Sequence, residues 1–250
     1  MLKRYYIRSV KLAERIFNET GYLTKLPVVR NLADIKELRF QKPVTFFVGE
    51  NGTGKSTLLE ALAVAMGFNA EGGSRNFNFS TNSTESRLHE FLAIAKADYP
   101  ADGYFLRAES FYNVASNIDE LDRQPAAAPL IAEAYGGLSL HQQSHGESFL
   151  SLVQNRFRGN GLYILDEPEA ALSPNKQLVL LSEFKRLVDH NSQLIISTHS
   201  PLLMAYPEAD IFVLSNDGIT LTRYEETEHY RLTRQFLDNP GRMLQILFGN

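Results

Sequence analysis

The amino-acid sequence predicts an α/β fold with a mostly parallel central sheet. Short apolar runs, typical of strands covered on both faces, occur at residues 44–48, 162–165, 194–197 and 211–214. Segments with apolar residues at helical spacing lie between them, at residues 55–66 and 176–188. Strands that alternate with helices in this way indicate parallel pairing, because each crossover helix packs back on the sheet.

The other segments have weaker patterns. We expect a strand at 2–12, a strand, loop and strand at 28–48, a short helix at 86–97 and a strand that begins at 104–106. Asn216, Asp217 and Gly218 predict a hairpin turn, and residues 228–250 predict helix with a break near Pro240. The prolines and glycines of residues 123–137 favour a lobe boundary there.

Composition excludes several classes of protein. The chain has 250 residues, of which 44% are hydrophobic, so it can bury a core and is not a disordered chain. Its lack of cysteine excludes a disulfide scaffold, a thiolate metal site and a cysteine nucleophile. No apolar run approaches the roughly 20 residues of a membrane helix, and the N-terminus has no signal-peptide pattern. We therefore expect a cytoplasmic protein without membrane insertion.

A phosphate-binding loop is the strongest local signal. Residues 49–56 match G-x-x-x-x-G-K-[ST] at every fixed position, between a predicted strand and a predicted helix. Its glycines let several backbone N–H groups point at one phosphate, and the helix N-terminus adds partial positive charge. Lys55 is expected to reach the β- and γ-phosphates, and the Ser56 hydroxyl to bind Mg²⁺. The predicted nucleotide-binding residues here are Gly49, Glu50, Asn51, Gly52, Thr53, Gly54, Lys55, Ser56 and Thr57.

Polar residues also follow two other apolar strands. Asp166 and Glu167 end the run at 162–165, and His199 follows the run at 194–197. Ligands bind at the carboxyl ends of parallel strands, so these side chains are expected near the loop. Asp166 is a candidate Mg²⁺ ligand, and Glu167 is a candidate to orient and polarise the attacking water. His199 is a candidate to contact the γ-phosphate or that water.

Together these residues resemble the ABC-type P-loop ATPase superfamily. Residues 49–56 are similar to its Walker A motif, 166–169 to its Walker B motif, 171–174 to its D-loop and 197–200 to its switch-histidine segment. Upstream, Ser144-His145-Gly146-Glu147 resembles the signature motif. The order and spacing of the five motifs are similar to those of the family, over roughly residues 28–215.

The resemblance implies a single ABC-type ATPase domain over residues 1–250. Its fold would be that of a P-loop NTPase, with helices flanking a mostly parallel sheet, an antiparallel N-terminal β part and a small helical lobe inserted at about 67–160. Glu167 would be the catalytic glutamate of a Mg²⁺-dependent ATPase. Ser144 and Gly146 would cap the γ-phosphate bound to a second copy, in a head-to-tail homodimer. An ordinary helix cap is the alternative for residues 144–148.

Three departures from the family narrow the resemblance. The signature differs from the transporter pattern L-S-G-G-Q at His145 and Glu147. This favours the soluble branch, which includes recombination and chromosome-maintenance ATPases and small predicted bacterial AAA/ABC-like ATPases. The family's Q-loop glutamine is not evident, and Glu109 or Ser110 stands near its place. No coiled coil separates residues 67 and 140.

The process that ATP would drive stays open. One alternative is a nucleotide-gated binding module that switches a partner protein or a nucleic acid, and another is the ATPase subunit of a membrane transporter. A net charge of −4 excludes a basic field over the whole surface, so it gives no support to nucleic acid as a partner, although a local patch stays open.

Overall fold

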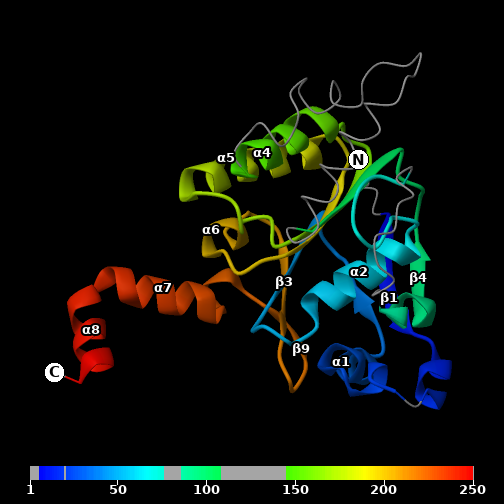
Figure 1. Cartoon of the computed structure of the whole chain (residues 1–250), viewed down its shortest axis with the longest axis horizontal. Coiled ribbons are helices and arrows are strands. Elements are labelled where there is room, and N and C mark those ends of the chain that lie inside the picture. Colours follow the sequence, from blue (N-terminus) through cyan, green and yellow to red (C-terminus); the bar gives the residue numbers. More distant parts are fainter. Residues whose placement is uncertain (1–5, 20, 76–85, 108–144, 250) are drawn as a thin grey trace.

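The computed structural model describes residues 6–19, 21–75, 86–107 and 145–249, and its strands form two sheets (Figure 1). The smaller, antiparallel sheet has the order β2-β1-β4. Its strands are β1 (Ile7–Leu12), β2 (Leu38–Arg39) and β4 (Leu92–Lys96). The larger sheet has the order β5-β6-β7-β3-β8-β9. Its strands are β3 (Val44–Val48), β5 (Asp102–Arg107), β6 (Gly161–Asp166), β7 (Gln193–Ser197), β8 (Asp210–Leu214) and β9 (Ile219–Thr222).

The larger sheet is parallel except at β9. Strands β5, β6, β7, β3 and β8 pair in parallel, and β9 turns back antiparallel to β8 after the predicted hairpin turn. The carboxyl ends of β6, β7 and β3 are therefore next to one another at one edge of the sheet. This order places the predicted phosphate loop beside the two predicted polar strand ends.

Helices cover both faces of this sheet. One face carries α4 (His145–Arg156), α5 (Pro174–Asp189) and the short α6 (Pro201–Met204), and the other carries α2 (Lys55–Ala65). Helix α1 (Pro27–Ile35) packs beside β1 and β9. Helices α7 (Glu228–Asp238) and α8 (Pro240–Phe248) extend outward at the C-terminal end (Figure 1). Short 3₁₀ helices are η1 (Glu14–Asn18), η2 (Leu23–Lys25), η3 (Arg87–Phe91) and η6 (Tyr224–Glu226).

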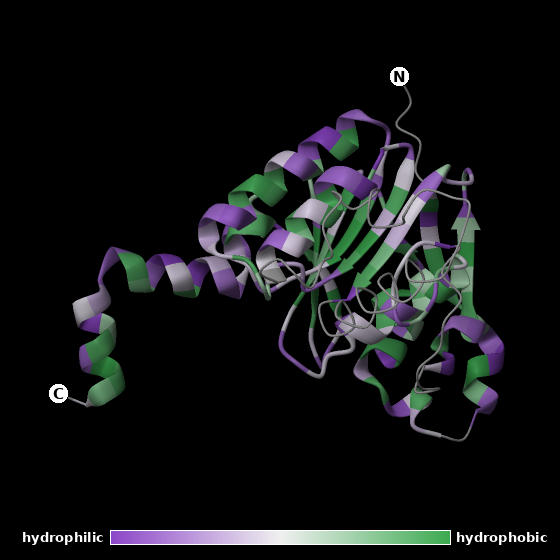
Figure 2. Ribbon diagram, turned by 45° about the horizontal axis from the view of Figure 1, so that its top comes forward, coloured by the Kyte–Doolittle hydropathy of each residue, from purple (hydrophilic) through white to green (hydrophobic). Residues whose placement is uncertain are grey.

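The sheet separates two apolar cores, as the green strands of Figure 2 indicate. Alternate residues of one strand point to opposite faces, so Phe46 packs with α4 and α5 while Phe47 packs with α1 and α2. Tyr163 and Ile164 of β6 divide in the same way. Two-sided burial explains why these strands are continuously apolar in the sequence.

One buried side chain joins the two sheets. Gln193, at the start of β7, is fully shielded from solvent. Its Oε1 accepts hydrogen bonds from the backbone N–H groups of Tyr6 and Ile7, both at 2.9 Å, and its Nε2 donates to the Ile7 carbonyl at 2.9 Å. A single amide thus satisfies three backbone groups of the N-terminal strand, which fixes the antiparallel sheet to the central one.

Two sequence predictions were wrong. Residues 28–48 begin with helix α1, not a strand, because Pro27 at the first helical turn and the buried Val28, Val29 and Leu32 form one helix face. Residues 86–97 form η3 and then β4, because β4 completes the antiparallel sheet by pairing with β1. Tertiary pairing here overrides local helical preference.

The α/β fold with a mostly parallel sheet is confirmed, as is the helix break near Pro240, where α7 ends and α8 begins. The division into one domain with a helical lobe at about 67–160 stays a prediction. Strands β4 and β5 belong to the two sheets, which restricts such a lobe to the chain after Arg107. Most of that segment lies outside the described residues.

The Gln193 bridge leads to a stability prediction. Replacing Gln193 with Leu keeps the volume but leaves three buried backbone groups without partners, so the free energy of unfolding should fall by about 3 kcal/mol. Chemical denaturation measures this change. The same substitution at the exposed Gln235 of α7 is the matched control and should change stability little. Equal stability of the two variants would show that the bridge contributes nothing.

Candidate functional site

The loop after β3 requires glycine at its two ends. Gly49 has φ +135°, and a Cβ there would lie 2.0 Å from the Leu214 carbonyl oxygen of β8. Gly54 has φ +94° and directly precedes α2, and a Cβ there would lie 2.6 Å from Cγ1 of Val28. Both positive φ and close packing exclude other residues. The sequence motif is therefore also a steric requirement of this fold.

Lys55 stands at the centre of the loop. Its side chain is buried, and Nζ donates to the carbonyls of Gly49 at 2.7 Å and Glu50 at 2.8 Å. Burial lowers the pKa of Lys55, and the nearby carboxylates, Glu167 foremost, oppose that change. The lysine is thus a cation held inside the ring of the loop, at the place where the backbone N–H groups of a helix N-terminus favour an anion.

The first residue after this lysine connects the loop with β6. Ser56 Oγ donates to Oδ1 of Asp166 at 3.1 Å, although the two residues are 110 positions apart. Ser197 Oγ, at the end of β7, donates to the same carboxylate atom. The residues predicted as metal ligands, Ser56 and Asp166, therefore do meet.

This pair suits a magnesium ion in its chemistry. A hydroxyl and a carboxylate are hard oxygen donors, and Mg²⁺ binds through one or two carboxylates, substrate phosphates and water. No cluster of three or more His, Cys, Asp or Glu side chains that could hold a metal occurs in the described part of the chain. Phosphate oxygens and water would have to complete the coordination of an ion at Ser56 and Asp166.

Glu167 lies beside this network in a strained backbone conformation. Its φ is +51°, in the left-handed region that is costly for a residue with a side chain. A hydrogen bond from its N–H to the Ser197 carbonyl, 3.1 Å long, holds the turn. Its Oε1 lies 3.5 Å from Nε2 of His199. The two predicted catalytic side chains are therefore neighbours at the sheet edge. Strained backbone conformations such as that of Glu167 concentrate at functional sites, which agrees with its predicted role.

His199 has two partners that the sequence analysis did not identify. Its backbone N–H donates to Oε1 of the half-buried Glu169 at 2.6 Å, and desolvation raises the pKa of this carboxyl. Its ring Nδ1 lies 3.3 Å from Nε2 of His229, on α7. Burial and the proximity of His199 lower the pKa of His229. Glu169 is visible in the D-E-P-E motif, but nothing in the sequence links His229 to His199.

A cavity of about 480 Å³ opens beside these residues. The loop contributes Glu50 and Asn51 to its wall, β7 contributes His199 through the turn that follows it, and α7 contributes the rest. The α7 residues are Glu228, His229 and Leu232. The cavity therefore lies on the same sheet edge as the loop, Glu167 and His199.

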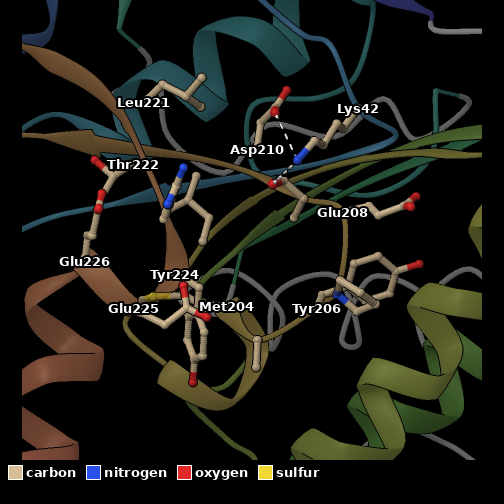
Figure 3. A pocket seen from close by; sticks show the side chains of 15 residues that line it. Lys42, Met204, Tyr206, Glu208, Asp210, Leu221, Thr222, Tyr224, Glu225 and Glu226 are labelled. Atoms are coloured by element: carbon tan, nitrogen blue, oxygen red, sulfur yellow. Dashed lines mark hydrogen bonds and ion pairs between the residues drawn. The ribbon is translucent and has the colours of Figure 1, made fainter.

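A larger cavity, of about 600 Å³, lies at the opposite edge of the sheet, where β3 and β8 begin (Figure 3). Lys42 contributes its cationic group, which donates to the Ala209 carbonyl at 3.0 Å and lies 3.8 Å from Asp210. Glu208, Glu225 and Glu226 also line it. Its one lysine is already engaged, and Arg223 is its only other basic lining residue against four acidic ones, so this cavity is a poor site for a triphosphate.

Of the predicted signature residues Ser144 and Gly146, the structure describes only Gly146. Gly146 is buried on α4, which packs against α5 on the face opposite α2. A Cβ at Gly146 would lie 2.5 Å from the Ala171 carbonyl, so the close approach of helix and turn requires glycine there. Ser144, Glu109 and Ser110 lie outside the described residues. No helix of the described residues is both long and apolar enough to cross a membrane.

The buried Asp166 leads to a prediction for the nucleotide-free protein. Burial raises the pKa of Asp166, which means that the fold disfavours its ionised form. Replacing Asp166 with Asn should therefore raise the free energy of unfolding at neutral pH. The gain should shrink as the pH falls through the pKa of Asp166, where the wild type becomes protonated and neutral.

Chemical denaturation without nucleotide, over a pH series, measures this effect. Replacing the exposed Asp217 with Asn is the control and should leave stability unchanged at every pH. Lower stability of the Asp166 variant at neutral pH would mean that the charge-assisted hydrogen bonds of Ser56 and Ser197 outweigh the cost of burial.

Comparisons with known proteins agree with this geometry. A family model described as an AAA ATPase domain matches residues 78–204, and one described as an AAA domain matches residues 29–109. The ribose import ATP-binding protein RbsA of Caldanaerobacter subterraneus is 22% identical over 86% of this chain, which spans only 46% of that relative. The tungstate uptake system ATP-binding protein TupC of Campylobacter jejuni is 22% identical over 86% of this chain and 71% of that protein.

The structure of cbiO1 from Clostridium perfringens, part of the ABC transporter complex cbiONQ, matches 98% of this chain and 99% of its own. The TM-score is 0.50 and the identity 17%. This likeness shows a shared fold. The AAA ATPase model covers half of the chain, including Asp166, Glu167 and His199. The chain belongs to the AAA ATPase domain family, within the ABC-type P-loop ATPases.

Proposed function

We propose that this protein binds ATP with Mg²⁺ at residues 49–57 and hydrolyses its γ-phosphate bond. The observation that carries the proposal is the hydrogen bond from Ser56 to Asp166. It joins the phosphate loop to the acidic strand end, so a phosphate on the loop would lie within reach of the metal ligands and of Glu167. An ion-binding pair and an adjacent carboxylate are the parts that phosphoryl transfer requires.

The side chains divide the chemistry among them. Lys55 and the N–H groups of the loop bind the β- and γ-phosphates, and Mg²⁺ bound by Ser56 and Asp166 would neutralise phosphate charge. Glu167 orients a water molecule and accepts its proton as the water oxygen bonds to the γ-phosphorus. The bond from that phosphorus to the β–γ bridging oxygen breaks, which yields ADP and inorganic phosphate. His199 donates from Nε2 to a γ-phosphate oxygen.

A second copy of the chain would complete the site. The cavity beside Glu50 and Asn51 is open to solvent at the expected place of the γ-phosphate. Residues 144–147 resemble the signature motif, so this segment of a second copy would cover the cavity. In the proposed head-to-tail homodimer, Ser144 and the helix beginning near Gly146 face the γ-phosphate of the partner. Each chain thus contributes one half of two sites.

Two other functions have specific support. A nucleotide-gated module that binds ATP and hydrolyses little would have the same loop, and it would switch a partner protein or nucleic acid. An ATPase subunit of a membrane transporter is supported by the names of the curated relatives, which are import and uptake proteins. The altered signature at His145 and Glu147 favours the ATPase that acts without a permease. Release of phosphate separates the enzyme from the switch, and copurification of a membrane subunit supports the transporter.

Removing the lysine tests binding. Replacing Lys55 with Ala removes the cation that would contact the phosphates, so ATP affinity should fall by at least about tenfold, the equivalent of one lost charged hydrogen bond. Isothermal titration calorimetry with ATP and Mg²⁺ measures this. Replacing the exposed Lys185 of α5 with Ala is the control. Equal ATP affinity of the Lys55 variant and the wild type would contradict the assignment of residues 49–57 as the ATP-binding loop.

Removing the carboxylate charge tests the chemistry. Replacing Glu167 with Gln preserves shape but removes the base, so turnover should fall by about 10²-fold or more while ATP still binds. Phosphate release and nucleotide content after mixing with ATP measure both. Unchanged turnover would move the role of base to another residue, with His199 as the next candidate.

The Glu167→Gln variant also tests assembly. ATP that is bound by two chains together favours the dimer by mass action, so light scattering should show a shift from monomer toward dimer when ATP and Mg²⁺ are added. Adding Ser144→Arg to this variant places bulk at the expected contact. It should abolish the shift and leave ATP affinity nearly unchanged. An unchanged mass with and without ATP in both proteins would contradict the shared site.

A further inference from the structure

Two histidine rings from distant segments meet at the edge of the cavity. Nδ1 of His199 lies 3.3 Å from Nε2 of His229, and the ring centroids are 5.4 Å apart with a tilt of 54°. His199 is 33% exposed at its side chain, whereas its Nε2 atom is shielded from solvent and has no hydrogen-bond partner among the described residues. Nδ1 of His199 is therefore engaged by His229, whereas Nε2 has no hydrogen-bond partner among the described residues and lies beside Glu167.

The charges around the pair determine which nitrogen carries the proton. One ring must donate and the other accept, since a neutral imidazole has one donor and one acceptor. Oε1 of Glu167 lies 3.5 Å from Nε2 of His199, and a lone pair at that nitrogen would face a carboxylate. A proton on Nε2 of His199 removes this repulsion. Nδ1 of His199 then accepts, so Nε2 of His229 donates.

The first turn of α7 holds His229 in place. Thr227, buried before this turn, donates from Oγ1 to the Tyr224 carbonyl at 2.7 Å and accepts from the N–H of Tyr230 at 3.3 Å. The Tyr224 hydroxyl donates to the Pro201 carbonyl at 2.9 Å. Pro201 opens α6, two residues after His199. The segment that carries His229 is thus tied to the segment that carries His199.

We propose that His229 is a positioning residue for His199. The N–H that it donates fixes His199 as the tautomer with its proton on Nε2, the nitrogen beside Glu167 that would donate to a γ-phosphate. This assignment rests on the proposed ATPase function and adds a residue that lies outside the five motifs. In functional histidines, the hydrogen bond made by one ring nitrogen commonly determines whether the other nitrogen carries the proton.

Packing alone does not account for His229. No residue of α7 is buried, so the helix does not use this ring to fill a core. The charged groups that act on it are His199, Glu228 and Lys55. Lys55 and His199 belong to the proposed site, and both disfavour a positive charge on His229. A neutral His229 ring has one N–H group, which it can donate to Nδ1 of His199 in a hydrogen bond.

Steady-state kinetics with ATP and Mg²⁺ test the proposal. Replacing His229 with Leu should lower kcat about tenfold and leave KM for ATP little changed. A loss of this size is expected when one hydrogen bond that acts in the transition state is removed. Replacing His229 with Gln retains an N–H donor and should keep kcat within about threefold of wild type. Gln235→Ala, an exposed change on the same helix, is the control and should keep wild-type kinetics.

The His199→Ala background separates positioning from a structural role. If His229 acts only through His199, then adding His229→Leu to His199→Ala should lower kcat no further. Full activity of the single His229→Leu variant, or an additional loss in the double variant, overturns the proposal. Equal losses in the Leu and Gln variants overturn it also.

A measurement without turnover separates this proposal from the proposed function. Side-chain ¹⁵N chemical shifts of labelled histidines report which ring nitrogen carries the proton. His199→Gln identifies the His199 signals among the six histidines. The expected wild-type result is a proton on Nε2 of His199 that becomes mixed in His229→Leu. A proton on Nδ1 in the wild type overturns the positioning role, whereas absent ATP turnover with the expected tautomers would overturn only the ATPase.

Discussion

The parallel adjacency of β6, β7 and β3 is the constraint on which the site depends. Parallel neighbours deliver their carboxyl ends to one edge, and the three segments that leave this edge carry the loop, the acidic turn and His199. Ser197 contributes most directly to this arrangement, because its hydroxyl reaches Asp166 and its carbonyl accepts from Glu167. A slip of one residue between β6 and β7 would turn this serine away.

The same edge concentrates charges that the fold disfavours. Burial lowers the pKa of Lys55 and raises the pKa values of Asp166 and Glu169, so both signs are held away from water. The strained φ of Glu167 adds to this cost. The apolar packing on both faces of the sheet provides the stability that offsets it. Hydrogen bonds from Ser56 and Ser197 then hold the Asp166 carboxylate in one orientation.

The sequence predicts the parts of this protein that local physics determines. The loop could be identified because Gly49 and Gly54 occupy positions that tolerate no side chain, and the central strands because both of their faces are buried. Helix α1 could not, since Val28 and Val29 suit a strand equally well and only their packing decides. Strand β4 depends on its pairing with β1, 80 or more residues earlier, which no short window contains.

His229 shows the same limit within the site. Its position is determined by Tyr224 and Thr227, which place the first turn of α7 against the residues that follow His199. None of these contacts has a short-range signature in the sequence, because α7 follows the last strand and would be interpreted as a surface helix. The motifs define which groups carry charge at the sheet edge. The segment beyond the sheet determines how one of them is oriented, so changes in α7 can alter the proposed chemistry without changing any motif residue.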